Sequence, residues 1–192
     1  MVDRRAAARA IEDFLRALGH PPEGDLEGTG ERVADAWADD LLEGEAIDAA
    51  AVLREGAIFG DGGGGLVVVR DLAVTTMCPH HLLPAHGTGL VAYLPGERIA
   101  GIGTLAHVVD ALSRRLTLQE RIGTAVVSLL TDELGARGAL CRLALVHSCL
   151  IARGERKAGA VVETLAVAGT FAHASHDRDL AFAALGRAGG GA

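Results

Sequence analysis

The sequence predicts an α+β fold in which an antiparallel sheet is combined with two consecutive helices. Val-rich stretches typical of strands occur as one pair before residue 95 and a second pair after residue 138, and two stretches with helical spacing lie between the pairs. The resulting order, β-β-α-α-β-β, favours antiparallel pairing. The chain has 192 residues, 49% of them apolar, which suits one core with an additional N-terminal segment.

The N-terminal part is predicted to be helical. Apolar residues at helical spacing, Ile11, Phe14, Leu15 and Leu18, precede Gly19 and a Pro-Pro turn. A second helix is expected to begin at Thr29, with Val33, Ala36, Trp37 and Leu41 on one face. We place a flexible break in the glycine run 62–65. The expected organisation is therefore a helical segment over 1–60, a main domain over 66–175 and a flexible Gly/Ala-rich tail over 187–192.

The elements of the main domain follow from its periodicity. The expected strands are 66–75, 87–94, 139–151 and 160–171. The two helices between them are marked by one apolar face from Leu105 to Leu112 and another from Ile122 to Leu130.

Composition excludes several classes of protein. A formal charge of −7 argues against a nucleic-acid-binding surface. Three cysteines argue against a disulfide framework and for a reducing compartment. Charges interrupt the first apolar stretch, so no export signal is expected, and no uncharged run approaches the ~20 residues of a membrane span. The sequence therefore predicts a cytoplasmic protein.

Two short segments carry residues that zinc prefers as ligands. Cys78-Pro79-His80-His81 and His147-Ser148-Cys149 supply thiolates and imidazoles. Cys78 and His81 are close enough for one turn to direct both at one ion. In a strand, alternate residues share a face, so His147 and Cys149 are expected to point the same way. Cys78, His81 and Cys149 would leave a fourth position open, as catalytic sites do. A structural site with His80 or His147 as fourth ligand is the alternative.

Three further features need an interpretation, and two of them have an open alternative. Cys141, in a Val/Leu-rich strand, is expected to be only a small buried hydrophobe. Thr117 followed by Glu120 matches a capping box, whereas the functional alternative is a Glu120 carboxylate that binds the donor edge of a purine. The cations Arg153, Arg156 and Lys157 form either an exposed turn or phosphate contacts beside Cys149.

The order of these segments resembles GTP cyclohydrolase I. The resemblance runs from about Thr29 to Phe171 and rests on Met77-Cys78-Pro79-His80-His81, Tyr93-Leu94-Pro95, Ser113-Arg114-Arg115-Leu116 with Gln119-Glu120-Arg121, and Val146-His147-Ser148-Cys149 with Ala152-Arg153-Gly154. It implies the tunnelling fold, in which two helices lie on one face of a ββααββ sheet. It also implies a homodecamer of two stacked pentamers, with active sites at subunit interfaces.

The resemblance implies a role for each site residue. Cys78, His81 and Cys149 would bind Zn²⁺, which polarises a water that attacks C8 of guanine. His80 would serve the ribose ring oxygen, and His147 would carry protons at C8. Glu120 would anchor the purine, with Gln119 beside it, and Arg153 and Arg32 would bind substrate. Formate would leave, and an Amadori rearrangement and ring closure would give dihydroneopterin triphosphate.

The resemblance fails at the segment that binds the triphosphate. Thr104 and His107 stand where the family has Lys and Arg, Gly103 replaces Ser, and Pro79 replaces an acidic residue. Charge-assisted contacts contribute roughly 1.5–3 kcal/mol each. The loss of two would weaken triphosphate binding by several powers of ten, unless Arg156 and Lys157 compensate.

Three functions follow from these observations. The first is a zinc-dependent cyclohydrolase that acts on GTP in pterin and tetrahydrofolate biosynthesis. The second is a divergent paralogue that acts on a purine with fewer phosphates. The third is a non-catalytic ring assembly that binds a pterin or nucleotide around a structural zinc.

Overall fold

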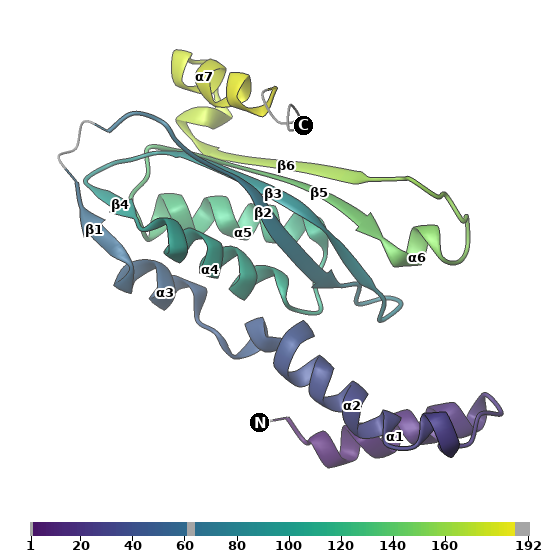
Figure 1. Cartoon of the computed structure of the whole chain (residues 1–192). Coiled ribbons are helices and arrows are strands. Elements are labelled where there is room, and N and C mark those ends of the chain that lie inside the picture. The colour runs from purple at the N-terminus through teal and green to yellow at the C-terminus, as the bar shows by residue number, and fades with distance from the viewer. Residues whose placement is uncertain (1, 61–63, 187–192) are drawn as a thin grey trace. The chain divides into compact units, whose positions relative to one another are not determined.

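The computed structural model describes residues 2–60 and 64–186 (Figure 1). Contacts divide the chain into two compact units, Met1–Glu43 and Gly44–Ala192. Residues 44–60 therefore pack with the second unit, while the functional division into 1–60 and 66–175 stays a prediction. The tail predicted over 187–192 lies outside the described residues.

The N-terminal unit is a pair of helices, which confirms the two predicted from the apolar spacing. Helix α1 spans Arg4–Ala17, and the side chain of its N-cap Asp3 accepts a hydrogen bond from the Ala6 amide. After the short 3₁₀ turn η1 (Gly24–Leu26), α2 spans Thr29–Ala36 and continues as the π-helical segment η2 (Trp37–Leu41). The helices approach closely because small residues meet: a Cβ added to Gly30 would lie 2.5 Å from the Ala8 carbonyl oxygen.

The second unit is built on a four-stranded antiparallel sheet. Its strands are β2 (Val67–Met77), β3 (Pro84–Leu94), β5 (Gly138–His147) and β6 (Val162–Gly169), in the spatial order β2-β3-β5-β6. Two three-residue strands, β1 (Ala57–Phe59) and β4 (Arg98–Ala100), form a separate antiparallel pair. The predicted α+β class and the antiparallel pairing are confirmed.

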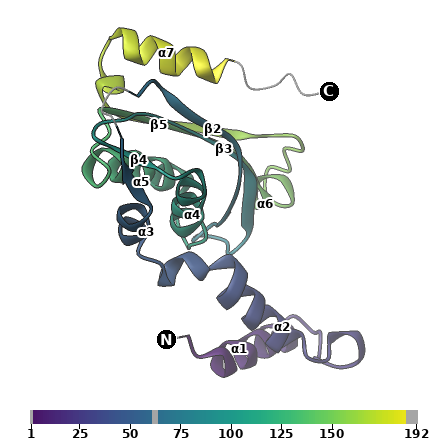
Figure 2. The same cartoon turned by 60° about the vertical axis from the view of Figure 1, so that its left-hand side comes forward.

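Two helices between the strand pairs cover one face of this sheet (Figure 1). Helices α4 (Ile102–Ser113) and α5 (Gln119–Asp132) bury their apolar faces against the strands, with Leu105 and Ile122 at most 2% exposed. On the opposite face, α7 (His176–Leu185) follows the 3₁₀ turn η4 (Thr170–Ala172) and covers a smaller cluster around Phe171 (Figure 2). The predicted β-β-α-α-β-β order is therefore present.

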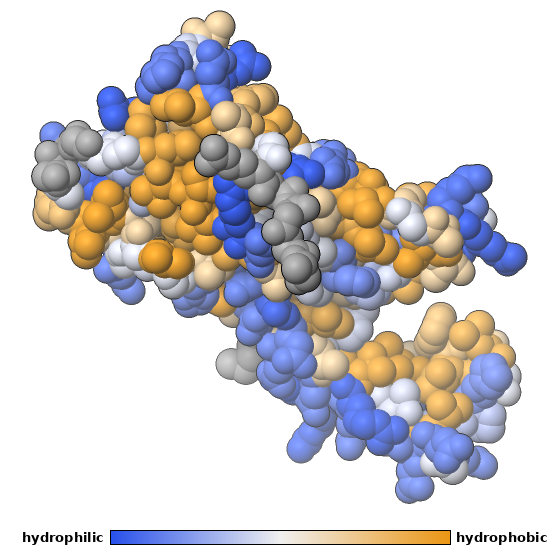
Figure 3. Space-filling model, turned by 45° about the horizontal axis from the view of Figure 1, so that its top comes forward, coloured by the Kyte–Doolittle hydropathy of each residue, from blue (hydrophilic) through white to orange (hydrophobic). Residues whose placement is uncertain are grey.

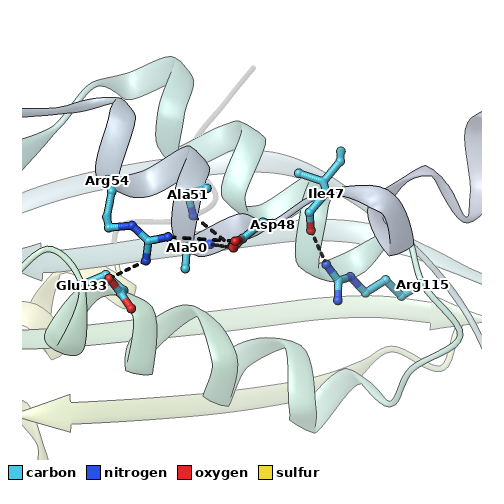
Figure 4. A network of polar contacts seen from close by, with 7 residues as sticks. All are labelled: Ile47, Asp48, Ala50, Ala51, Arg54, Arg115 and Glu133. Atoms are coloured by element: carbon cyan, nitrogen blue, oxygen red, sulfur yellow. Dashed lines mark hydrogen bonds and ion pairs between the residues drawn. The ribbon is translucent and has the colours of Figure 1, made fainter.

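Helix α3 (Ala49–Glu55), preceded by the turn η3 (Glu43–Ala46), is tied into the second unit by polar contacts (Figure 4). Asp48 caps the helix by accepting hydrogen bonds from the Ala50 and Ala51 amides. Arg54 donates to Glu133 at the end of α5 at 2.8 Å, and Arg115 donates to the Ile47 carbonyl at 2.8 Å. These bonds fix the segment before α3 beside α4 and α5.

The structure corrects two sequence predictions near the site. The strand predicted over 139–151 ends at His147, because Ser148–Ile151 forms the short helix α6. The capping box at Thr117 is also absent: Leu118 is the N-cap of α5, and no side chain caps it. Thr117 instead donates its backbone N–H to the Met77 carbonyl at 3.2 Å, so it belongs to an extended segment beside β2.

Apolar surface is present on each unit taken by itself (Figure 3). In the N-terminal unit, Phe14 and Leu18 are 60% and 58% exposed; in the second, Phe59 and Ile102 are 85% and 74% exposed. Among the described residues, no helix combines the length and the apolar character needed to cross a membrane.

Candidate metal centre and active site

The Cys78 segment is a tight connection between β2 and β3. The Cys78 amide donates to the Leu83 carbonyl at 3.0 Å, and the Leu82 amide donates to the Cys78 carbonyl at 2.9 Å. Leu82 has a φ of 52°, a left-handed conformation that costs a non-glycine residue about 1–2 kcal/mol. This turn brings Cys78 Sγ within 3.6 Å of His81 Nδ1.

The third sulfur reaches the same place through sheet pairing. His147, the last residue of β5, pairs with Ala85 at the start of β3, so the end of β5 lies beside the Cys78 turn. Cys149 then follows on α6 rather than on the strand. The ligand atoms of Cys78, His81 and Cys149 all lie within 4.8 Å of one another. The structure therefore brings the predicted ligands together. Cys149 reaches the group from a helical turn, whereas the sequence predicted that it would lie on the same strand face as His147.

The three donor atoms fit a divalent cation. Ligands at about 2.3 Å (sulfur) and 2.0–2.1 Å (nitrogen) from a tetrahedral zinc are about 3.6 Å apart, which matches the separation of Cys78 Sγ and His81 Nδ1. Burial raises the pKa of the Cys149 thiol, and the neighbouring Cys78 raises it further, since two thiolates repel each other. A cation held between the sulfurs would remove that repulsion. His80 and His147 are not members of this group in the described part of the chain.

A pocket of about 270 Å³ opens beside the three donors. His80 and His81 are exposed at one side of it, with their ring centroids 6.2 Å apart in an edge-to-face arrangement. The pocket is lined by both predicted segments and by the start of α5: Thr76, Cys78, Pro79, His80, His81, Thr117, Leu118, Gln119, Glu120, His147, Cys149 and Val162. Residues from four separate parts of the sequence thus meet at one cavity.

His147 and Gln119 are joined by a hydrogen bond. His147 Nε2 lies 2.8 Å from Gln119 Oε1. The pKa of His147 is lowered because the ring is partly buried, while the negative charge of Glu120 acts in the opposite direction. Gln119 itself is only 2% exposed, in contrast to Glu120, which is exposed in the first turn of α5.

The predicted substrate contacts occupy different environments. Arg153 is exposed just after α6, and its positive charge lowers the pKa of Cys149, so it lies near the metal-ligand group. Arg32 lies in α2 of the N-terminal unit, where it donates to the Glu27 carbonyl at 2.8 Å and to Thr29 Oγ1 at 3.0 Å. The role of Arg32 in binding substrate stays a prediction.

The start of α4, where the basic residues were expected, has no cation. Thr104 packs against the α3 end: a Cβ added to Gly56 would overlap the Thr104 side chain. His107 is exposed on the next turn. For contact with a phosphate, this segment therefore has only the hydroxyl of Thr104, which is packed against α3, and the imidazole of His107.

Sequence reasoning missed two residues that line the pocket. Thr76 is 1% exposed at the end of β2 and donates to the Arg115 carbonyl at 3.3 Å. Val162 begins β6, and its carbonyl accepts from Gln119. The strand pattern places Thr76 two residues before Cys78, a usable signal, whereas nothing near Val162 in the sequence indicates the site.

Comparisons with known proteins identify the family of the chain. The model of the family described as GTP cyclohydrolase I matches residues 7–185. The GTP cyclohydrolase 1 of Leifsonia xyli subsp. xyli is 39% identical over 171 residues, which cover 88% of this chain and 89% of that protein. The GTP cyclohydrolase 1 of Chromobacterium violaceum is 41% identical over 170 residues, covering 88% and 82%, and that of Bacillus pumilus is 35% identical over 176 residues, covering 90% of each.

Proposed function

The chain belongs to the GTP cyclohydrolase I family of enzymes and has its α+β tunnelling fold, and we propose that a zinc ion held by Cys78, His81 and Cys149 supports its reaction. The proposed reaction consumes GTP and water and yields formate and dihydroneopterin triphosphate. One water adds at C8 of guanine and opens the imidazole ring to a formamide, and a second water hydrolyses the formamide, so that C8 leaves as formate and a free amine remains. The ribose then rearranges and closes onto the freed amine, with loss of water.

The convergence of two thiols and one imidazole is the observation that supports this proposal most directly. Three protein donors with a fourth position left open are typical of catalytic zinc, while structural zinc normally has four protein ligands. A zinc ion bound there would supply a Lewis acid that activates water at neutral pH.

The other residues of the pocket are suited to guanine. N1–H and the 2-amino group of guanine are adjacent donors, and the Glu120 carboxylate offers two acceptor oxygens at the pocket. His80 and His147 line the same pocket and are the proposed proton-transfer groups. Arg153, beside Cys149, is the proposed phosphate contact.

The test compares two cysteine substitutions. Cys149→Ala removes a proposed ligand, so we expect bound zinc, measured by mass spectrometry of the metal, to fall well below the wild-type content. Formate release from GTP and pterin fluorescence should disappear with it. Cys141→Ala is the matched control, because Cys141 is 0% exposed in the core and outside the ligand group. Equal formate release by the two variants would contradict the proposed metal role.

A second candidate substrate is a guanine compound with fewer phosphates. Thr104 and His107 favour it, since the start of α4 lacks the two cations that a triphosphate would be expected to contact. Turnover of GTP, GMP and guanosine by the same preparation decides between the two substrates. A strong preference for GTP would reject the second candidate.

The proposed assembly is a homodecamer of two stacked pentamers, with sites at the subunit interfaces. Within the described residues, β2 and β6 each have one edge without a strand partner, and these edges favour such an assembly. The participation of the protein in pterin and tetrahydrofolate biosynthesis stays a prediction, as does its cytoplasmic location.

A further inference from the structure

Gln119 has a buried side-chain amide whose oxygen and nitrogen can be assigned from their hydrogen-bond partners. The side chain is 2% exposed at the start of α5, between the sheet and His147. Its Nε2 lies 3.2 Å from the Leu143 carbonyl oxygen, 3.0 Å from the Val162 carbonyl oxygen and 3.1 Å from Thr164 Oγ1. Two of these three partners are backbone carbonyls, which can only accept hydrogen bonds.

The orientation of the amide follows from these acceptors. With the opposite orientation, Oε1 of Gln119 would face two carbonyl oxygens without a hydrogen between them, and a buried acceptor without a donor is strongly disfavoured. The two N–H groups of Gln119 must therefore point at β5 and β6. That leaves Oε1 on the side of His147, at 2.8 Å from His147 Nε2.

The orientation of Gln119 in turn determines the tautomer of His147. A carbonyl oxygen accepts and does not donate, so His147 Nε2 must carry the hydrogen of this bond. A neutral imidazole has a single N–H, so Nδ1 keeps its lone pair. Within the described residues, the hydrogen bond to Gln119 is the one protein hydrogen bond of this ring. Nδ1 is therefore the nitrogen that remains available to a ligand in the pocket.

We propose that Gln119 is a positioning residue that holds His147 in the Nε2–H tautomer, rather than a direct contact to the substrate. This inference rests on the proposed function, in which His147 carries protons at the purine. In this tautomer, the lone pair of His147 Nδ1 can accept a proton. The Gln119–His147 hydrogen bond also holds the plane of the ring, because Gln119 is itself hydrogen-bonded to β5 and β6. The side chain that contacts guanine directly is then Glu120, the neighbouring exposed residue.

The first experiment measures the tautomer directly. The full-length protein is labelled with ring-¹⁵N histidine, and the His147 signals are identified by their loss in His147→Ala. We expect a protonated Nε2 and an unprotonated Nδ1 in the wild type. In Gln119→Leu, which has no acceptor for His147, the two tautomers should exchange. Thr164→Val is the matched control, because it removes one of the three acceptors and leaves the two carbonyls that orient Gln119.

Two results of this experiment would overturn the proposal. One is a wild-type His147 with its hydrogen on Nδ1, a result that does not require any variant to fold. The other is a Gln119→Leu protein whose His147 stays wholly in the wild-type tautomer.

The second experiment separates a positioning role from substrate binding. Loss of a residue that orients a functional imidazole typically lowers activity about 10–100-fold, so Gln119→Leu should lower kcat by that factor with KM nearly unchanged. Thr164→Val leaves the two carbonyl acceptors that orient Gln119 and should remain close to wild type. A rise in KM with unchanged kcat in Gln119→Leu would identify Gln119 as a substrate contact and overturn the proposal.

A failure of the proposed function can be distinguished from a failure of the proposal for Gln119. If the wild-type protein releases no formate from GTP, the proposed function is wrong. The ¹⁵N spectra then still confirm or contradict the tautomer that Gln119 is proposed to hold.

Discussion

At the scale of single residues, the three cysteines occupy chemically different environments. Cys78 and Cys149 are half-buried at the pocket, whereas Cys141 is 0% exposed in β5. Burial raises the pKa of Cys141 to about 12, because the thiolate loses its hydration. The thiolate is the reactive form, so Cys141 should be inert in the folded protein.

This difference predicts the result of a thiol titration. After removal of metal with a chelator, we expect Cys78 and Cys149 to react with Ellman's reagent at about pH 8, because both side chains are partly exposed. Cys149 should react more slowly than an unperturbed thiol, since its pKa is raised. Cys141 should react only after denaturant is added. The sign follows from the raised pKa: at every pH below it, Cys141 stays a neutral thiol.

The variant Cys141→Ala provides the control for this titration. It should leave the number of thiols that react in the folded protein unchanged and should abolish the additional reaction in denaturant. Fast reaction of all three thiols in the folded wild type would contradict the buried position of Cys141.

Local sequence was sufficient for some site residues and insufficient for others. Cys78 and His81 could be predicted because a single turn carries both, and Cys149 because zinc needs a further donor of the same kind. The hydrogen bonds of Gln119 could not, since their acceptors Leu143, Val162 and Thr164 lie 24, 43 and 45 residues away. Gln119 was expected beside the substrate, and only the packed sheet reveals the acceptors that orient it.

At the scale of secondary-structure elements, two helical glycines have opposite surroundings. Gly30 of α2 faces the backbone of α1, and a Cβ there would lie 2.5 Å from the Ala8 carbonyl oxygen. Gly103 of α4 is exposed, and a Cβ there would have no atom within 4 Å. Alanine stabilises a helix by about 0.5–1 kcal/mol relative to glycine when there is room for it.

We therefore expect the two Gly→Ala substitutions to have opposite signs. Gly103→Ala should raise the free energy of unfolding by about 0.4–1 kcal/mol. Gly30→Ala should lower it by about 1–3 kcal/mol, because overlap with a backbone oxygen costs more than helix propensity contributes. Urea unfolding followed by circular dichroism measures both. A stabilised Gly30→Ala would show that α1 and α2 do not pack as described.

The element boundaries that were wrong also have a physical explanation. Residues 139–151 form one nearly continuous apolar run, and such a run does not distinguish a strand from a strand followed by a helical turn. Thr117 and Glu120 have capping-box spacing, but the backbone of Thr117 is engaged by Met77, which excludes it from the N-cap position. At Thr117, a contact with the end of β2 decides the local structure.

At the scale of the whole molecule, the start of α4 lies well away from the pocket of its own chain. The far end of α4 adjoins the site, since the Met77 amide donates to the Arg115 carbonyl at 3.2 Å. Helix α4 has 12 residues and is therefore about 18 Å long. Thr104 lies about 14 Å and His107 about 9 Å along the helix from Ser113. We therefore expect Thr104 to reach a substrate in the pocket from a neighbouring copy of the chain.

The sheet edges lead to the same expectation. The outer edges of β2, with 11 residues, and β6, with 8, have no strand partner in the described part of the chain. Long unpaired edges are normally covered, and a second copy of the chain supplies a matching edge. We expect such a ring to place the start of α4 from one chain near the pocket of another.

The assembly predicts a large native mass. Light scattering on the purified full-length protein should give about ten times the 19.7 kDa of one chain if the edges close into two stacked rings. Because each pocket would then depend on a neighbour, dilution that dissociates the assembly should reduce formate release per chain in parallel with the mass. A protein that stays at 19.7 kDa and turns over GTP at full rate would contradict both the assembly and the shared site.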